Sequence, residues 1–271
     1  MTPKVALTAY GLVGGLGVAG TASGGSWLPF PANGERFPDP NRRPFRRFGK
    51  LDALSQAVVA AAEMLGLSLL EEDLPPREWG LVLASAFGCL DVDYFYHLSR
   101  EEPAGPSPLL FMYTLPSSPL GQLAIRHRVV GPNLCLLTQG LPGIEAVVEG
   151  FHLVDNREAP ACICVCADSL SPEAARMVSG EACGDASARH EAAAFLLESW
   201  PPSEDEGRSV LAWLDLTAPS EVTEPGHSWA GRKALTQLRQ GLTENASGVK
   251  ETITFSTGQD VGGQAVQLRW A

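Results

Sequence analysis

The feature that most constrains the fold is an alternation of short apolar runs with segments of helical periodicity. Residues 5–10, 80–85, 134–138 and 161–167 have the length and apolar character of buried strands. Between the first two runs, residues 51–65 place Leu, Val and Ala near the helical period. Strands that alternate with helices are typical of layered α/β domains with a buried sheet. The sequence therefore predicts an α/β fold.

The pattern continues through most of the chain and weakens near its end. Helices are expected at residues 91–98, 120–129 and 143–153, and further strands at 192–198 and 210–216. After Pro219 only a helix at 233–242 and an edge strand at 266–270 are indicated. We therefore expect a main domain over residues 1–216 and an extension over 217–271 that packs on the same domain.

Charge and hydropathy narrow the possible partners. The 31 acidic and 20 basic residues give a formal net charge of -11, which disfavours nucleic acid and anionic membrane surfaces as partners. No apolar segment has the length needed to span a bilayer. The start of the chain is interrupted by glycines, unlike a secretory signal. We expect a soluble, cytoplasmic protein.

Three of the six cysteines, Cys162, Cys164 and Cys166, alternate along one predicted strand. Side chains two apart on a strand share a face, so the three thiols are expected to point the same way. A metal cluster is one interpretation, but no paired Cys-x-x-Cys motif or nearby histidine supports it. Buried small hydrophobic residues are the favoured interpretation, and no metal or cofactor is expected.

A glycine motif near the start resembles a dinucleotide-binding fingerprint. Gly15, Gly17 and Gly20 have the Gly-x-Gly-x-x-Gly spacing and follow a predicted strand. The fingerprint requires a helix after the last glycine, because the helix N-terminus binds the pyrophosphate. Here Ser23, Gly24 and a proline-rich loop follow instead. The motif is therefore expected to serve a loop or turn.

A family resemblance comes from residues 131–146, which contain a Gly-Pro turn, an apolar strand, Thr138 and small residues that open a helix. This segment resembles the nucleophile region of the β-ketoacyl synthases, in which a cysteine lies at the start of the helix. Weaker similarities follow in the same order as in that family, at residues 46–48, 81–88, 107–118, 166–170 and 190–198. The resemblance implies a thiolase-like fold, mainly the N-terminal half of the αβαβα layered architecture.

Two departures from the family pattern bear on activity. An ungapped match places Gly140 at the nucleophile position, and a one-residue slip places Gln139 there; neither side chain can form a thioester. The family also carries two catalytic histidines in its C-terminal half. None of His97, His127, His152, His190 and His227 has the matching sequence context. The resemblance therefore implies a truncated member without intrinsic condensing activity and with no catalytic residue to assign.

The resemblance also implies an interface and a tunnel. In the family, the strand before the nucleophile pairs antiparallel with its counterpart across a two-fold axis. The corresponding interface residues here are Asn133, Leu134, Cys135, Leu136, Leu137 and Thr138. The positions that line the family's acyl tunnel are occupied by Phe111, Met112, Tyr113, Leu115 and Leu120, for which ordinary core packing is the alternative.

Three functional hypotheses follow. The first is a chain-length-factor-like subunit that pairs with a full-length β-ketoacyl synthase in polyketide or fatty-acid-type biosynthesis and meets an acyl carrier protein through that partner. The second is a malonyl-carrier-protein decarboxylase that uses the Gln-substituted site. The third is a stand-alone homodimeric scaffold.

Overall fold

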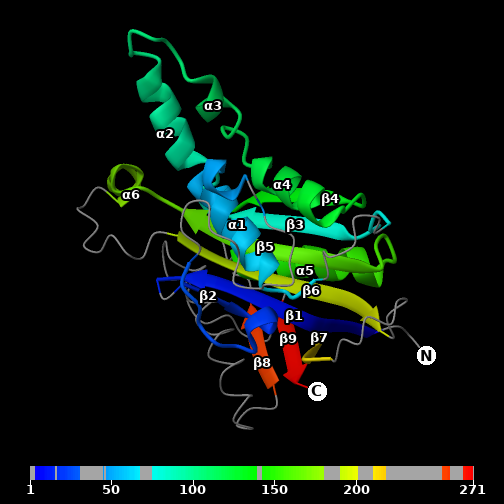
Figure 1. Ribbon diagram of the computed structural model, residues 1–271. Helices are drawn as coiled ribbons and strands as arrows, with labels where there is room; N and C mark the ends of the chain where they lie inside the picture. Colours follow the sequence, from blue (N-terminus) through cyan, green and yellow to red (C-terminus); the bar gives the residue numbers. More distant parts are fainter. Residues whose placement is uncertain are drawn as a thin grey trace.

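A computed structural model describes residues 4–15, 17–30, 45, 47–67, 75–138, 142–179, 190–200, 210–217, 252–256 and 265–270 of the 271-residue chain. Within these residues the chain forms one mixed β-sheet with helices on both faces (Figure 1). From edge to edge the described strands run β4-β3-β5-β6-β1-β7-β9-β8, and β2 pairs with β1 beside this path. β3 is parallel to β4 and β5, whereas β5 and β6 are antiparallel.

The strands and helices have the following bounds. The strands are β1 (Lys4–Gly14), β2 (Gly17–Gly20), β3 (Gly80–Ser85), β4 (Asn133–Leu137), β5 (Ala161–Ser169), β6 (His190–Trp200), β7 (Ala212–Thr217), β8 (Thr252–Ser256) and β9 (Ala265–Trp270). The α-helices are α1 (Ala53–Glu63), α2 (Leu90–Ser99), α3 (Pro108–Phe111), α4 (Ser118–His127), α5 (Pro142–Asp155) and α6 (Pro172–Ser179). The predicted α/β class is confirmed, and each predicted element before residue 217 has a counterpart.

The order of the strands differs from the prediction at the edge of the sheet opposite β4. Residues 266–270 were expected to form an edge strand, but β9 lies between β7 and β8. The edge is formed by β8, which the sequence analysis missed because its polar and apolar residues alternate over only five positions. β8 and β9 belong to the same sheet as β1 and β7, because β1 pairs with β7, β7 with β9, and β9 with β8. The helix predicted at 233–242 lies outside the described residues.

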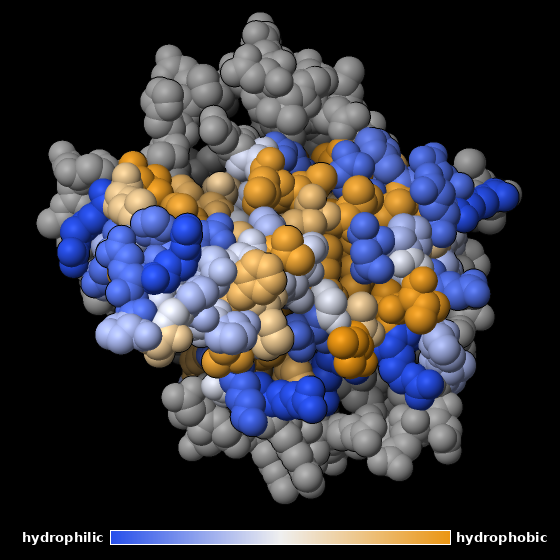
Figure 2. Space-filling model, turned by 90° about the horizontal axis from the view of Figure 1, so that it is seen from above, coloured by the Kyte–Doolittle hydropathy of each residue, from blue (hydrophilic) through white to orange (hydrophobic). Residues whose placement is uncertain are grey.

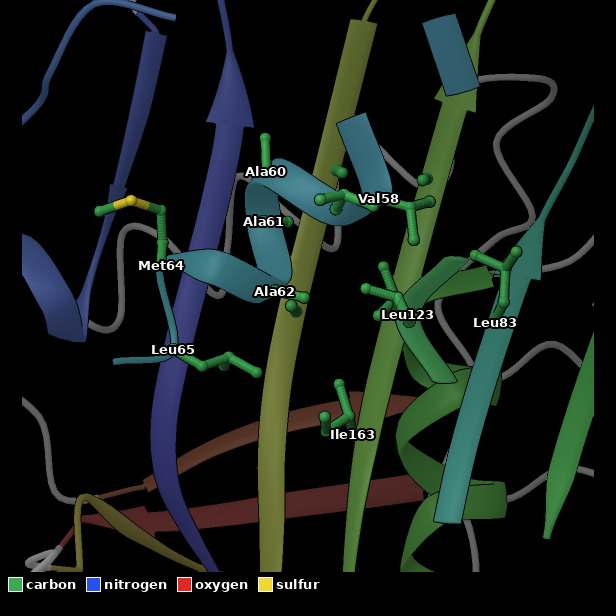
Figure 3. Packing of buried hydrophobic residues seen from close by; sticks show 14 of the residues in the cluster. Val58, Ala60, Ala61, Ala62, Met64, Leu65, Leu83, Leu123 and Ile163 are labelled. Carbon is green, nitrogen blue, oxygen red and sulfur yellow. The ribbon is translucent and has the colours of Figure 1, made fainter. Parts of the chain in front are cut away.

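The sheet separates two apolar clusters, because successive side chains of a strand point to opposite faces. Leu83 and Ile163 face α1 and α4, as the close-up in Figure 3 shows, and Leu81 belongs to the same cluster. Val82 and Cys164, one residue along, join the cluster that includes α5. The described core therefore has three layers: helices α1 and α4, the sheet, and helix α5.

Helix α1 is buried along almost its whole length and is the centre of the first cluster. The Asp52 carboxylate accepts hydrogen bonds from the N–H groups of Leu54 (3.1 Å) and Ser55 (3.3 Å), which caps the start of the helix. Gly66, with a φ of 81°, follows its end. Between these ends, the run from Ala57 to Ala62 has no exposed surface.

The glycine motif serves this close packing. β1 and β2 form a hairpin, and only a short 3-10 helix, Thr21–Ser23, follows it, so the arrangement is not that of a dinucleotide-binding site. A Cβ on Gly20 would lie 2.7 Å from the Met64 carbonyl oxygen of the chain that leaves α1. A Cβ on Gly11 would lie only 1.9 Å from the Ala61 carbonyl oxygen. Both glycines let the hairpin backbone touch α1. Of the motif glycines, Gly17 and Gly20 lie in strand β2 rather than in the expected loop or turn.

The three alternating cysteines lie on one face of β5, as predicted, and are buried beneath α5. Helix α5 approaches them at Gly150, where an added Cβ would lie 2.0 Å from Cys164 Sγ. The small thiol side chains and Gly150 thus set the spacing between this helix and the sheet. Within the described part of the chain, no three His, Cys, Asp or Glu side chains are grouped so that they could hold a metal ion.

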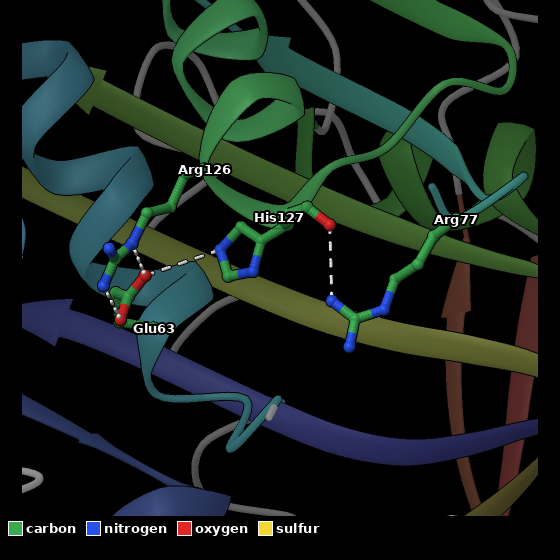
Figure 4. Close-up of polar contacts among 4 residues, drawn as sticks. All are labelled: Glu63, Arg77, Arg126 and His127. Atoms are coloured by element: carbon green, nitrogen blue, oxygen red, sulfur yellow. Dashed lines mark hydrogen bonds and ion pairs between the residues drawn. The ribbon is translucent and has the colours of Figure 1, made fainter. Parts of the chain in front are cut away.

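A buried ion pair joins α1 to α4 (Figure 4). Arg126 Nε and Nη2 donate to the two carboxylate oxygens of Glu63 at 2.9 and 3.2 Å. His127 Nε2 lies 3.6 Å from Glu63 Oε1, and the Arg77 guanidinium donates to the His127 carbonyl oxygen at 3.3 Å. The Arg126 guanidinium also stacks over the Phe45 ring. This network fixes α4, and with it the surface described next, against the central helix.

Candidate interaction surface

Strand β4 is one edge of the sheet, and within the described residues β3 is its only partner. Gly131, two residues before β4, lets the chain approach the start of β3, because a Cβ there would lie 2.3 Å from the Trp79 carbonyl oxygen. β3 is buried throughout and β5 is buried except at the half-buried Asp168, whereas β4 is exposed at both ends and half-buried between them. A short apolar edge strand of this kind is a ready template for another strand.

The backbone direction of β4 follows from its bonds to β3. Leu81 N–H donates to the Pro132 carbonyl oxygen at 2.8 Å, and Thr138 N–H donates to the Ser85 carbonyl oxygen at 3.1 Å. Backbone groups alternate sides along a strand, so those of Leu134 and Leu136 also face β3. The N–H and C=O groups of Asn133, Cys135 and Leu137 therefore point to the open edge.

The side chains of β4 divide between the two faces of the sheet. Leu134 and Leu136 pack against the cluster beneath α5, and Cys135 packs against the cluster around α1. Asn133 and Leu137 share the face of Cys135, because they lie two residues away from it. Leu137 and Pro116 both lie beside Gly88, since a Cβ built on Gly88 would be 2.8 Å from Leu137 Cδ2 and 3.6 Å from Pro116 Cβ.

An excursion of the chain between β3 and α4, residues 90–117, rises above this edge and carries α2 and α3 (Figure 1). Seen from above, apolar side chains gather on the face that these helices form with α4 and β4 (Figure 2). We call this set the apolar patch; its members are Phe95, Leu98, Leu109, Phe111, Met112, Leu115, Ile125, Val130 and Leu137. Side chains of this kind exposed together are typical of interaction sites.

Hydrogen bonds hold the base of the excursion at two places, around Asp168 and at Cys89. Asp168 Oδ1, at the end of β5, accepts hydrogen bonds from Ser85 Oγ (2.6 Å) and from the N–H groups of Ala86 (3.0 Å) and Phe87 (3.1 Å). Burial raises the pKa of Asp168, and these hydrogen bonds oppose that shift. On the other side, Cys89 Sγ donates to the Thr114 carbonyl oxygen at 2.8 Å. The two ends of the excursion are thereby tied together.

The expected tunnel residues fall into two groups. Phe111, Met112 and Leu115 lie on the surface with about 60% of each side chain exposed, within the apolar patch. Leu120 is buried in the cluster around α1, and Tyr113 packs against that cluster while its hydroxyl donates to the Lys50 carbonyl oxygen. The sequence analysis missed Leu109, Ile125 and Val130. The only indication that the sequence offers is the neighbour of each large apolar residue: a proline, a charged residue and a glycine, respectively.

The expected nucleophile positions, Gln139 and Gly140, lie outside the described residues. Next to them in the sequence, Thr138 Oγ1 donates a hydrogen bond to Glu145 Oε1 at 2.8 Å, and Glu145 lies in the first turn of α5. The nearest thiol in sequence, Cys135, has its pKa raised by burial. Cys89 has its pKa raised to about 12, by burial first and then by Asp93. Neither thiol is poised as a thiolate at neutral pH.

The four described histidines do not converge on a site. His127 is buried beside Glu63, and His190 Nδ1 lies 2.8 Å from Ser169 Oγ across β5 and β6. Ser169 is only 1% exposed, so this serine–histidine contact is closed to a substrate. His97 and His152 lie in the last turns of α2 and α5. His227 lies outside the described residues.

The fold is that of solved ketosynthase structures, although no described protein family and no curated protein matches the sequence. The ishigamide ketosynthase/chain length factor aligns at 21% identity with a TM-score of 0.56, over 79% of this chain and 67% of that one. A chain of the ketosynthase (ApeO) complex with its chain length factor (ApeC) from Xenorhabdus doucetiae aligns at 18% identity with a TM-score of 0.60. That alignment covers 98% of this chain and 99% of the other.

A β-ketoacyl synthase from Burkholderia phymatum STM815 aligns at 13% identity with a TM-score of 0.55, over 80% of this chain and 64% of the synthase. The chain thus spans about two thirds of the first and third structures and nearly all of the second. These similarities define the class of fold: the chain has the thiolase-like fold of ketosynthases and chain length factors. In the described residues, none of the helices is long and apolar enough to cross a membrane.

Proposed function

We propose that this chain is a non-catalytic, chain-length-factor-like subunit that pairs with a ketosynthase through β4 and the apolar patch. The observation that carries the proposal is the open β4 edge, which lies next to an exposed apolar surface in a ketosynthase-like fold. A partner strand would satisfy the outward backbone groups, and the partner's surface would remove the patch from water. Both effects favour association.

The proposed lack of catalysis rests on side-chain chemistry. A ketosynthase nucleophile must carry acyl groups as a thioester, and the candidate positions hold an amide side chain at Gln139 and none at Gly140. Cys89 and Cys135 offer no substitute, because burial keeps both as thiols. The partner would therefore supply all of the condensing chemistry, and would also meet the carrier protein.

The exposed members of the tunnel set support a role in limiting product length. Phe111, Met112 and Leu115 present large side chains on the surface that a partner would cover. Once covered, they would line or close the far end of the partner's acyl channel, where their volume sets the room for a growing chain. We expect Phe111→Ala in the reconstituted pair to lengthen the products that mass spectrometry detects. Unchanged product length would remove Phe111 from this role.

Co-expression with a ketosynthase from the same genome tests the pairing. Leu137→Lys introduces a charge at the β4 edge and should weaken ketosynthase binding at least about 10-fold, because a buried unpaired charge opposes association. Met177→Lys on α6 is the matched control, since Met177 is 62% exposed and Leu137 59%, and Met177 lies outside the apolar patch. Isothermal titration calorimetry measures the affinity of each variant for the ketosynthase. Equal affinities for the two variants and the wild-type chain would contradict the proposed pairing surface.

A further inference from the structure

The outward backbone groups of β4 define the register of a partner strand. Asn133, Cys135 and Leu137 each offer one N–H and one C=O to the open edge, as deduced above from the bonds to β3. In an antiparallel pair, residues directly opposite each other alternate between hydrogen-bonded and non-hydrogen-bonded sites. Only a register centred on Cys135 engages all three outward residues. If the register is centred on Leu134 or Leu136 instead, one of the three outward residues has no residue of the partner strand opposite it.

This register has a consequence for self-pairing. If two copies of the chain paired about a two-fold axis at Cys135, Asn133 of each copy would lie opposite Leu137 of the other. Both side chains are exposed, and both lie on the face that carries Cys135. The Asn133 amide donates to the Gly131 carbonyl oxygen at 3.0 Å. Two polar amides would then face two leucines, and the mismatch would occur twice because the axis repeats it.

We propose that Asn133 is a specificity-determining residue that disfavours pairing of this chain with itself. The β4 edge then selects a non-identical chain of the same fold. The strand of that chain would carry an apolar residue opposite Leu137 and a polar residue opposite Asn133. This inference rests on the proposed function and extends it, because it names the side chains that make the pairing heterologous.

The size of the effect follows from cross-strand pair energies. A favourable pair of directly opposite side chains stabilises a sheet by a few tenths to about 1 kcal/mol. Two symmetric pairs should therefore change the self-association constant by about 2- to 30-fold, at about 1.4 kcal/mol per tenfold. Asn133→Val creates two Val–Leu pairs in the self-paired arrangement and should tighten self-association by that factor.

Sedimentation velocity over a concentration series measures this change with the purified full-length chain. Asn156→Val is the matched control, because Asn156 is also an exposed asparagine but lies beyond the end of α5, away from the β4 edge. We expect tighter self-association for Asn133→Val and none of this change for Asn156→Val. No tightening with Asn133→Val, or equal tightening with both variants, would overturn the specificity role.

Disulfide trapping tests the register independently. Asn133→Cys and Leu137→Cys are placed in a Cys135→Ser background, because Cys135 faces its own counterpart in the Cys135-centred register. When the two chains are mixed and mildly oxidised at high concentration they should form a covalent dimer, because positions 133 and 137 face each other in this register. Each variant alone should give none. In a register centred on Leu134 or Leu136, the introduced cysteine would face position 135, which carries serine, and the mixture would not cross-link. Cross-linking of a single variant, or none in the mixture, would refute the register.

The two proposals fail in different ways. If Leu137→Lys abolishes ketosynthase binding while Asn133→Val leaves self-association unchanged, the pairing surface stands and the role of Asn133 is wrong. If Leu137→Lys binds the ketosynthase as tightly as Met177→Lys does, the proposed function itself is wrong.

Discussion

Replacing Arg126 with leucine should be among the most destabilising single changes in the chain. Glu63 is 1% exposed and the Arg126 side chain 7%, and the two form a bidentate pair at 2.9 and 3.2 Å (Figure 4). Removing the guanidinium takes away both of these hydrogen bonds and leaves His127 Nε2 at 3.6 Å from Glu63 Oε1. A buried carboxylate that loses its main partner is poorly compensated.

The magnitude follows from the behaviour of buried ion pairs. Breaking such a pair by removing one partner destabilises a protein by about 3–5 kcal/mol. Replacing both partners with apolar residues of similar size is often neutral, because the desolvation penalty of both charges disappears as well. We therefore expect Arg126→Leu to lower the free energy of unfolding by about 3–5 kcal/mol. The Glu63→Leu/Arg126→Leu double variant should recover most of that loss.

Urea unfolding at neutral pH measures the cycle, with the surface pair of α6 as the control. Arg176 and Glu173 lie 4.0 Å apart, with side chains 58% and 40% exposed. Exposed pairs contribute about 0–1 kcal/mol, so Arg176→Leu should change stability little. If Arg126→Leu costs no more than Arg176→Leu, the ion pair does not hold α4 against α1. If the double variant is as unstable as Arg126→Leu, desolvation of the charges is not the reason.

Three further outcomes are expected. Gly11→Ala should destabilise the fold by about 3 kcal/mol or more in urea unfolding, because the added Cβ would overpack against the Ala61 carbonyl oxygen and force α1 away. The control is Gly121→Ala on α4, where the added Cβ would meet open space; it should stabilise the fold by about 0.5–1 kcal/mol. Asp168→Ala should cost about 2–4 kcal/mol through three lost hydrogen bonds, whereas Asp168→Asn keeps the acceptor. Because burial raises the pKa of Asp168, its charged carboxylate opposes folding at neutral pH. The asparagine variant should therefore be at least as stable as the wild type at pH 7. The difference in unfolding free energy between the two should shrink as the pH falls and the wild-type carboxyl becomes protonated. Cys89 and Cys166, with pKa values raised to about 12, should stay unmodified by iodoacetamide at pH 8 in the folded chain and react after unfolding, as peptide mass spectrometry would show.

Much of the fold was predictable because its signals are local. The strands β3 and β5 each contain a continuous apolar run, residues 81–84 and 161–167, and α1 has both its capping residue Asp52 and its terminating Gly66. The common face of the three cysteines of β5 follows from the two-residue period of any strand. The place of β9 inside the sheet was not predictable, because strand order depends on pairings between residues far apart in sequence.

The candidate surface was predictable in part. The resemblance to β-ketoacyl synthases indicated the strand from Asn133 to Thr138 as an interface, and the structure places β4 at a sheet edge, where such pairing is possible. It did not indicate which of the tunnel residues are exposed: Leu120 is buried, whereas Phe111 and Leu115 lie on the surface. These residues are all apolar and lie within ten positions of one another, so composition and spacing do not separate them.

The sequence alone determined the alternation of strands and helices, the side chains that line each face of a strand, and the absence of a thiol at Gln139 and Gly140, because each depends on residue type and local period. Only the tertiary structure decided that β4 ends the sheet and that Glu63 meets Arg126 across two helices. Those relations join segments separated by tens of residues, and the packing of the whole chain sets them.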